Sequence, residues 1–90
     1  MIIEIDNKRY KVIKDYKDAF DKEEFIKKYT SFFYEYDYIV GDIAYSKLRL
    51  KGFTKKENKI HNKINDFVNV EKYIEENCAF DCKHFILEKL

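Results

Sequence analysis

The run DYIVGDIAYSKLRLKGF, residues 37–53, contains two β-rich segments, Tyr38–Asp42 and Lys47–Phe53, joined across residues 43–46. In the second segment, apolar and basic side chains alternate, as in a strand that packs one face on a core and turns the other to water. The apolar face holds Leu48 and Leu50, and the basic face holds Lys47, Arg49 and Lys51. We therefore expect a pair of strands here with one basic face, and the rest of the fold is arranged around it.

Upstream of this run, six apolar residues follow the period of an α-helix and share one stripe. They are Phe25, Ile26, Tyr29, Phe32, Phe33 and Tyr36. Asp21 stands at the N-cap position before the stripe, and Phe20 is placed to pack against Phe25. These residues predict a helix that begins after Asp21, buries this stripe and forms the main support of the core.

The remaining segments complete the predicted order of elements. Ile2–Asp6 and Arg9–Asp15 are β-prone and separated by Asn7 and Lys8, which indicates a hairpin. Residues 54–67 are polar without periodicity and predict a mobile loop. A second helix is expected to begin at Asn69 as cap, with Val68 packed on Tyr73, and its apolar residues are Val70, Tyr73, Ile74 and Cys78. The last strand is expected at Lys83–Lys89.

The order ββαββαβ predicts an α+β fold, a small mixed or antiparallel sheet with two helices packed against it, in one domain over residues 1–90. Without its first strand the order is βαββαβ, which ferredoxin-like and RNA-recognition domains share. The RNA-recognition motif itself is not matched. Lys51-Gly52-Phe53 imitates its opening, but Thr54-Lys55-Lys56 follows where a small residue and a second aromatic are required.

Charge is segregated along the chain. The net charge of the whole chain is +1, which alone gives no reason to expect nucleic acid. Residues 47–63, however, hold seven cations and a single acid, Glu57, so this segment carries +6 and the remainder carries −5. The basic character therefore falls on the second strand of the central pair and on the loop that follows it.

Composition points to a protein of the cytoplasm that does not enter membranes. Met1–Asp6 has neither a basic region nor an apolar run typical of a signal peptide. No stretch approaches the roughly 20 apolar residues that a membrane span requires. The two cysteines, Cys78 and Cys82, are too few for a disulfide-stapled secreted scaffold, which favours a reducing compartment.

The same cysteines, with His84 and the loop residue His61, are weak candidates for a metal site. Structural zinc sites pair two closely spaced knuckles, and this chain has a single wide spacing. We expect no metal and no cofactor, with the two thiols reduced and packed as small apolar groups. A redox role for the pair stays open as an alternative, because cysteines four residues apart come within bridging distance where the chain bends.

The acidic residues do not form a catalytic pattern. Asp15, Asp18, Asp21, Asp37 and Asp42 are not spaced to hold two carboxylates against one nucleophile or metal, and Asp42 is interpreted as a turn former. The chain also has no glycine loop for phosphates and no local Ser/His/Asp set. We therefore expect a protein that is not an enzyme.

The central run DYIVGDIAYSKLRLKGF resembles the signature block of the YutD-like family of small bacterial proteins. The ending is similar to that of the family as well, because Cys78 and Cys82 are separated by three residues and followed by the aromatic-aliphatic run KHFIL. The opening KVIKDY, residues 11–16, also matches, whereas Ile43-Ala44 stands where the family has an aromatic-glycine pair. The resemblance implies a fold and a cytosolic bacterial setting and assigns no catalytic residues.

A binding function on the basic segment follows from these observations. Basic side chains neutralise phosphates and aromatic rings stack on unpaired bases, which predicts nucleic-acid binding, RNA before DNA. The alternative is a protein-interaction adaptor that docks this face on an acidic partner. The candidate binding residues are Lys47, Arg49, Lys51, Lys55, Lys56, Lys59, Lys63, Tyr38, Tyr45 and Phe53. Exposure of the three rings separates the two interpretations, whereas the partner's identity and the oligomeric state are not set by the sequence.

Overall fold

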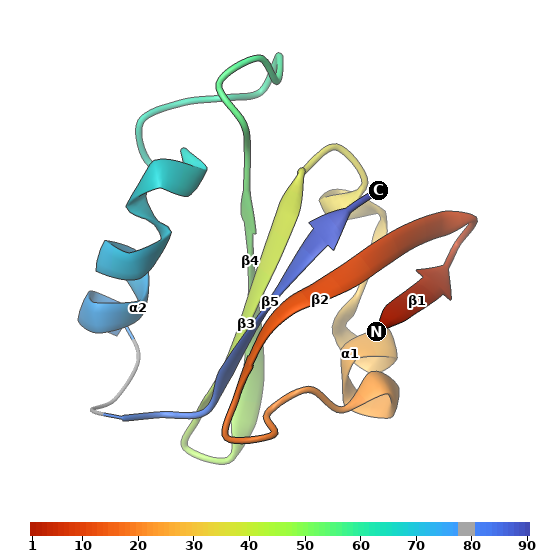
Figure 1. Ribbon diagram of the computed structural model, residues 1–90, viewed down its shortest axis with the longest axis vertical. Coiled ribbons are helices and arrows are strands. Elements are labelled where there is room, and N and C mark those ends of the chain that lie inside the picture. Colours follow the sequence, from red (N-terminus) through yellow and green to blue (C-terminus); the bar gives the residue numbers. More distant parts are fainter. Residues whose placement is uncertain (78–80) are drawn as a thin grey trace.

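The computed structural model describes residues 1–77 and 81–90, which form a five-stranded sheet with helices on both sides (Figure 1). The strands are β1 (Ile2–Ile5), β2 (Lys8–Tyr16), β3 (Tyr38–Ala44), β4 (Lys47–Phe53) and β5 (His84–Lys89). The α-helices are α1 (Lys22–Lys28) and α2 (Val70–Asn77), and two 3-10 helices are η1 (Ser31–Phe33) and η2 (Phe67–Asn69). The expected α+β class and order are confirmed.

Every neighbouring pair of strands is antiparallel, in the order β1-β2-β5-β3-β4. The last strand in the sequence therefore lies in the middle of the sheet, and β1 and β4 lie at its edges. Both hairpins turn on two residues with left-handed backbone: Asp6 and Asn7 between β1 and β2, and Tyr45 and Ser46 between β3 and β4. The first turn lies one residue earlier than the sequence indicated. The second turn has two residues, whereas the sequence indicated a connection of four, residues 43–46.

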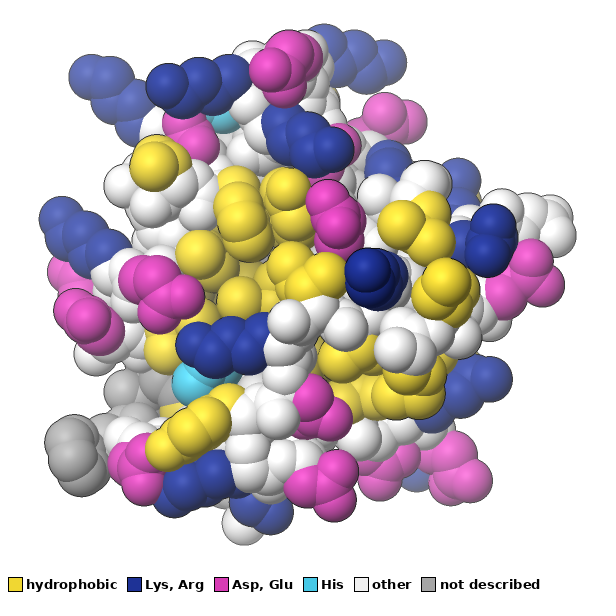
Figure 2. Space-filling view, in the orientation of Figure 1, with side chains coloured by type: hydrophobic (Ala, Val, Ile, Leu, Met, Phe, Trp, Pro, Cys, Tyr) yellow, Lys and Arg dark blue, Asp and Glu magenta, His cyan; other side chains and the backbone are white. Residues whose placement is uncertain are grey.

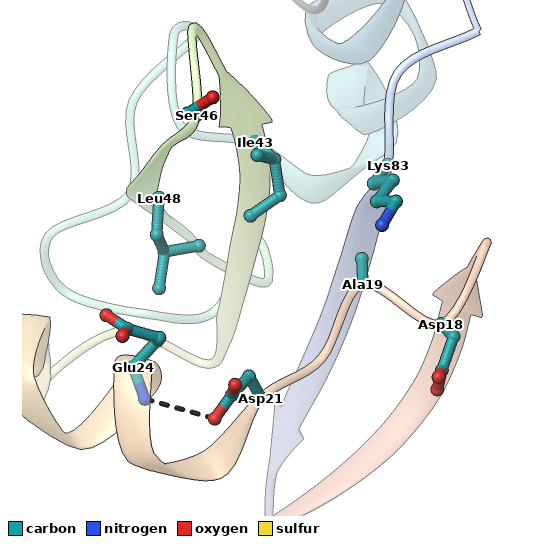
Figure 3. A pocket seen from close by; sticks show the side chains of 8 residues that line it. All are labelled: Asp18, Ala19, Asp21, Glu24, Ile43, Ser46, Leu48 and Lys83. Carbon is teal, nitrogen blue, oxygen red and sulfur yellow. Dashed lines mark hydrogen bonds between the residues drawn. The ribbon is translucent and has the colours of Figure 1, made fainter.

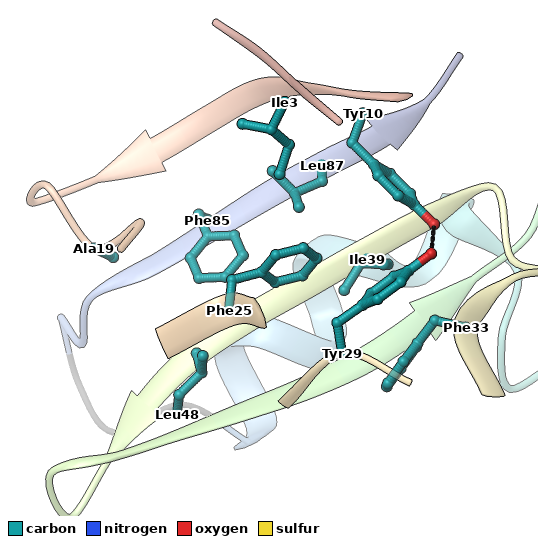
Figure 4. Close-up of a cluster of buried hydrophobic side chains, with 10 residues drawn as sticks. All are labelled: Ile3, Tyr10, Ala19, Phe25, Tyr29, Phe33, Ile39, Leu48, Phe85 and Leu87. Atoms are coloured by element: carbon teal, nitrogen blue, oxygen red, sulfur yellow. Dashed lines mark hydrogen bonds between the residues drawn. The ribbon is translucent and has the colours of Figure 1, made fainter. Parts of the chain in front are cut away.

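The two faces of the sheet carry separate cores because alternate residues of each strand point to opposite sides. Ile39, Phe85 and Leu87 pack toward α1, in the cluster drawn in Figure 4. Val40 and Ile86 pack toward α2. In the first cluster the buried hydroxyls of Tyr10 and Tyr29 are 2.7 Å apart, and burial, followed by this hydrogen bond, raises the pKa of Tyr10. Five more residues complete the first cluster: Ile3, Ala19, Phe25, Phe33 and Leu48.

The first helix is shorter than the apolar stripe suggested. Asp21 caps it as expected, accepting from the backbone N–H groups of Glu23 and Glu24. The helix then ends at Lys28, because Tyr29 adopts an extended backbone and the Thr30 hydroxyl accepts from the N–H of Phe32 to begin η1. This break rotates the later part of the stripe. Phe25, Tyr29 and Phe33 are buried, whereas Phe32 is 66% exposed and Ile26, before the break, is 45% exposed, so the predicted places of these two residues in the core are wrong.

The second helix also begins differently from the prediction. Asp66 caps the 3-10 turn η2, and its side chain accepts from the N–H of Val68. Asn69 is not a cap, since its amide donates to the carbonyl of Lys63. Val68 is 75% exposed and does not pack on Tyr73. The sequence misplaced this start because an aspartate three residues earlier provides the cap and adds a 3-10 turn before the helix.

The placement of the helices separates this fold from an RNA-recognition domain. α1 covers one face of the sheet and α2 covers the other, as Figure 1 shows on the two sides of the strands. RNA-recognition domains stack bases on aromatic residues of an open sheet face. The described part of this chain has no uncovered face over β3 and β5. It also contains no helix with the length and apolar character needed to cross a bilayer.

Candidate functional site

The basic strand β4 divides its side chains between the two faces as predicted. Leu48 and Leu50 belong to the core under α1. Arg49 and Lys51 lie on the opposite face, where their cationic groups contact residues of α2. Lys47 is exposed at the start of the strand, beside the β3–β4 turn. The predicted alternation of side chains is thus confirmed, but the basic face of β4 packs against α2.

Arg49 is tied into the fold by two elements. Its Nε donates to Oδ1 of Asp42 at 3.2 Å, and its Nη2 donates to the second oxygen of that carboxylate and to the carbonyl of Asn77 at 2.6 Å. Asp42 is only 2% exposed and lies opposite Arg49 in the β3–β4 register. The hydrogen bond with Asp42 is the main cause that raises the pKa of Arg49. This side chain therefore neutralises a buried acid and holds the end of α2 to the sheet.

The aromatic rings beside the basic row are mostly buried. Phe53 is fully buried, and Tyr38 is 9% exposed and stacks on Phe67 with ring centroids 3.7 Å apart. Lys51 lies over the rings of Phe53 and Tyr73, at 5.5 and 5.9 Å from their centroids. Of the three rings proposed to meet bases, Tyr45 alone is exposed, at 99%. The structure thus leaves one of these rings accessible for stacking.

The loop that follows β4 is built on a network of hydrogen bonds, in contrast to the mobile segment expected. Its centre is Asn65, which is 5% exposed. The Asn65 side chain accepts from the Thr54 hydroxyl and from the N–H of Asn62, both at 2.8 Å, and it donates to the carbonyl of Ile60 at 3.0 Å. Asn58 anchors the loop tip by donating to the carbonyl of Glu35 at 2.7 Å.

A second polar contact fixes the end of the loop. His61 Nε2 and a carboxylate oxygen of Asp66 are 2.9 Å apart, and this hydrogen bond, with the N–H of Val68, lowers the pKa of Asp66. The four lysines of the loop stand on this framework with exposed side chains: Lys55, Lys56, Lys59 and Lys63. Figure 2 shows Lys and Arg side chains gathered at the end of the molecule where this loop lies in Figure 1.

A groove of about 350 Å³ joins the strand and loop halves of the basic segment. It runs beside β4 and α2, and its lining is Lys51, Lys63, Ile64, Asn69, Lys72, Tyr73, Glu76 and Asn77. The sequence predicted Lys51 and Lys63 at such a site and missed Lys72 and Tyr73. The sequence placed Lys72 and Tyr73 next to each other on a helix predicted to pack against the sheet. It did not show that this helix lies along β4, so these two residues could not be assigned to the groove.

A pocket of about 340 Å³ at the other end of the sheet has the opposite charge (Figure 3). Three acids line it, Asp18, Asp21 and Glu24, together with Lys83. Its remaining lining residues are Ala19, Ile43, Ser46 and Leu48. Asp21 caps α1, so the start of this helix accounts for one of the three acids in the pocket. The segregation of charge along the sequence becomes a separation in space.

The weak metal candidates are not assembled into a site among the described residues. His61 is engaged with Asp66, and His84 is buried, with Nδ1 3.0 Å from the carbonyl of Cys82 and its ring stacked on Tyr16. No group of three or more His, Cys, Asp or Glu side chains in this part of the chain is arranged to hold a metal.

The cysteine pair departs from the expectation of two reduced thiols. Cys82 is disulfide-bonded, and Cys78 lies outside the described residues. Cys82 belongs to irregular backbone beyond α2, directly after Asp81, whose φ of 59° turns the chain. The prediction of a reduced thiol is therefore wrong for Cys82, and the bridged state that the sequence left open as an alternative agrees with the bend at Asp81.

Comparison with known proteins places the chain in a family. Residues 4–88 match the family described as "YutD-like: Putative antitoxin YutD-like". A protein of Bacillus subtilis (strain 168) named "Putative antitoxin YutD" is 36% identical over 89 residues, which is 99% of this chain and 98% of that protein. The solution NMR structure of protein yutD from B. subtilis matches with a TM-score of 0.83, covering 100% of this chain and 82% of that one. The chain therefore belongs to the YutD-like family.

Proposed function

We propose that this chain is a non-catalytic binding protein that docks on an acidic protein partner through its lysine surface. The lysine surface comprises the exposed loop lysines and the lysines of the groove between β4 and α2: Lys51, Lys55, Lys56, Lys59, Lys63 and Lys72. In the described part of the chain, no ion pair joins these six side chains to an acid. Such a surface is complementary to a partner that presents carboxylates.

The observation that carries this choice is the burial of the rings beside the basic row. Single-stranded nucleic acid is held by cations together with aromatic platforms on which bases stack. Tyr38 and Phe53 are in the core, and both faces of the sheet are covered over β3 and β5. Tyr45 is exposed, but it lies at the far end of the seven-residue strand β4, roughly 20 Å from the loop lysines at about 3.3 Å per residue. An electrostatic contact with a protein fits this arrangement better than base stacking.

The name of the relative agrees with a binding role. The B. subtilis protein is named "Putative antitoxin YutD", and an antitoxin counteracts a toxin. We take this chain to act by binding, because its loop lysines are exposed, and because Asp21 and Asp42 serve as a helix cap and an ion-pair partner. We infer that the partner of this chain is a protein whose acidic surface meets the lysine surface.

The test is capture of partners from a cell lysate, with and without nuclease, followed by binding to the purified partner. Lys56→Glu, Lys59→Glu and Lys63→Glu together should abolish binding, because they reverse the charge at the loop. The matched control reverses three exposed lysines elsewhere, Lys11, Lys22 and Lys28, and should bind normally.

Loss of capture after nuclease treatment would contradict the proposal. It would do so most clearly if the purified chain also bound a single-stranded oligouridylate, with affinity falling by about 0.7 log units per log unit of salt for each phosphate contacted. RNA binding would then become the leading interpretation.

A further inference from the structure

The outer edge of β4 presents backbone groups that the sheet does not use. The N–H of Ile43 donates to the carbonyl of Lys83, and the N–H of Lys89 donates to the carbonyl of Asp37. The backbone groups of the odd-numbered residues of β3 therefore bond to β5. The even-numbered residues of β3 therefore bond to β4, where they lie opposite Lys47, Arg49, Lys51 and Phe53. It follows that the N–H and C=O groups of the intervening residues, Leu48, Leu50 and Gly52, point away from the sheet.

The chain itself begins to pair with this edge. The N–H of Thr54 donates to the carbonyl of Asn65 at 2.7 Å, and the N–H of Phe67 donates to the carbonyl of Thr54 at 2.9 Å. These two bonds form an isolated parallel bridge between Thr54 and Asp66. The bridge is one residue long and directly follows β4, so among the described residues the stretch from Leu48 to Gly52 has no strand partner on its outer side.

The two sides of this edge differ in character. On the α2 side lies the groove, which is lined by three lysines, Lys51, Lys63 and Lys72, and one acid, Glu76. On the α1 side the ring of Tyr36 covers Gly52, where a Cβ atom would lie 2.3 Å from the ring, so only glycine admits this contact. The exposed ring of Phe32 lies 5.6 Å from that of Tyr36. A strand added here would turn alternate side chains toward lysines and toward aromatic rings.

We propose that the outer edge of β4 binds an extended segment of the partner in which acidic residues alternate with apolar ones. The segment pairs its backbone with Leu48, Leu50 and Gly52, directs its acids to the lysine groove and its apolar side chains to Tyr36 and Phe32. Main-chain bonds supply affinity in such strand addition, and alternate side chains supply specificity. The acidic character of the segment rests on the proposed function, whereas the mode of binding rests on the geometry of the edge.

The charge of the strand also argues against a second copy of this chain as the occupant. Pairing two β4 edges would bring Lys47 and Lys51 of the two copies beside each other, whereas Arg49 is already paired with Asp42. Like charges on neighbouring strands destabilise the pairing, and edge lysines are a common protection against self-association. A partner strand with carboxylates at these positions removes the repulsion.

The experiment is a titration of the full ¹⁵N-labelled chain with the peptide Ac-Glu-Val-Glu-Val-Glu-Val-Glu-NH2, followed by hydrogen exchange. Binding should slow exchange of the Leu48, Leu50 and Gly52 amides at least tenfold, because these donors gain partners. The amides of Arg49 and Lys51, already bonded to β3, should change little. The peptide with Lys in place of Glu should not bind.

Two matched variants test the backbone contact separately from the side chain. Leu50→Pro removes the outward N–H, and Leu50→Ala truncates the same side chain but keeps that donor. Peptide affinity should fall at least tenfold in the proline variant relative to the alanine variant. If the proline variant does not fold, the exchange measurement on the unaltered chain decides the question.

The outcomes distinguish this inference from the proposed function. Peptide binding that leaves exchange at Leu48, Leu50 and Gly52 unchanged would overturn strand addition, while the acidic-partner proposal would stand. If the purified partner bound equally well after the loop charges were reversed, the proposed function would fail. Slowed exchange at these three amides in the presence of the peptide would still support the edge as a strand-binding site.

Discussion

The two halves of the basic segment have the same charge in the sequence and different roles in the structure. In the strand half, Arg49 is bound to Asp42 and to the end of α2, and Lys51 lies over two rings. In the loop half, the lysines are exposed on a framework that hydrogen bonds of neutral side chains hold together. Positive charge on a strand therefore indicates either a binding residue or a structural one, and its neighbours decide between the two.

The largest effect that this comparison predicts is from Arg49→Ala, which would leave the carboxylate of Asp42 buried without its cation. Removal of one member of a buried ion pair costs about 3 to 5 kcal/mol, and we expect the lower end because the Arg49 side chain is 46% exposed. The free energy of unfolding should be measured by urea denaturation at neutral pH. The end of α2 should also lose hydrogen-exchange protection, since its carbonyl contact is removed.

Lys47→Ala is the matched control for this prediction, because Lys47 lies on the same face and is exposed. It should change the free energy of unfolding by no more than about 0.5 kcal/mol. Equal losses in the two variants would show that Arg49 has no special role in the fold, and the distinction between the two halves would then disappear.

The ion pair between Asp42 and Arg49 could have been foreseen from the sequence with one more step. The alternation in Lys47–Phe53 predicted the strand and its faces correctly. The connection was taken to be residues 43–46, which made Asp42 a turn former, whereas the structure turns at Tyr45 and Ser46. A two-residue turn at that point sets the register that places Asp42 opposite Arg49.

An intermediate effect is expected from Asn65→Ala, which tests whether the loop half depends on its polar framework. The change removes three side-chain hydrogen bonds in a buried position and should cost about 2 to 3 kcal/mol. Exchange at the amides of Thr54 and Phe67 should speed up, because the bridge between β4 and the loop loosens.

The control is Asn69→Ala, which removes one hydrogen bond near the surface and should cost less than about 1 kcal/mol. Similar midpoints for both variants and the unaltered chain would mean that the loop is mobile, as its composition suggested.

The loop and the first helix show where sequence patterns fail in this fold. The order of the loop comes from contacts between distant polar groups, such as Asn58 with the carbonyl of Glu35, and periodicity does not record such contacts. The apolar stripe continued past Lys28 in the sequence because Phe32 and Phe33 kept its spacing. Thr30 nevertheless ends the helical run by capping a new turn, which leaves Phe32 outside and Phe33 inside.

The smallest effect on stability is expected from neutralising the loop lysines together, in the variant Lys56→Gln, Lys59→Gln and Lys63→Gln. No ion pair in the described part of the chain involves these side chains, and exposed substitutions of this kind change the free energy of unfolding by about 0.5 kcal/mol or less each. The mutual repulsion of the three lysines is relieved at the same time, so the total change in the free energy of unfolding should lie close to zero and should depend little on salt.

Binding of this variant to the acidic partner should nevertheless weaken and lose most of its salt dependence, because the lysines supply long-range attraction. Urea denaturation and partner titration at low and high salt measure the two effects on the same protein. A loss of stability comparable to that of Arg49→Ala would show that the loop lysines hold the fold, and the loop half would then have the same structural role as Arg49.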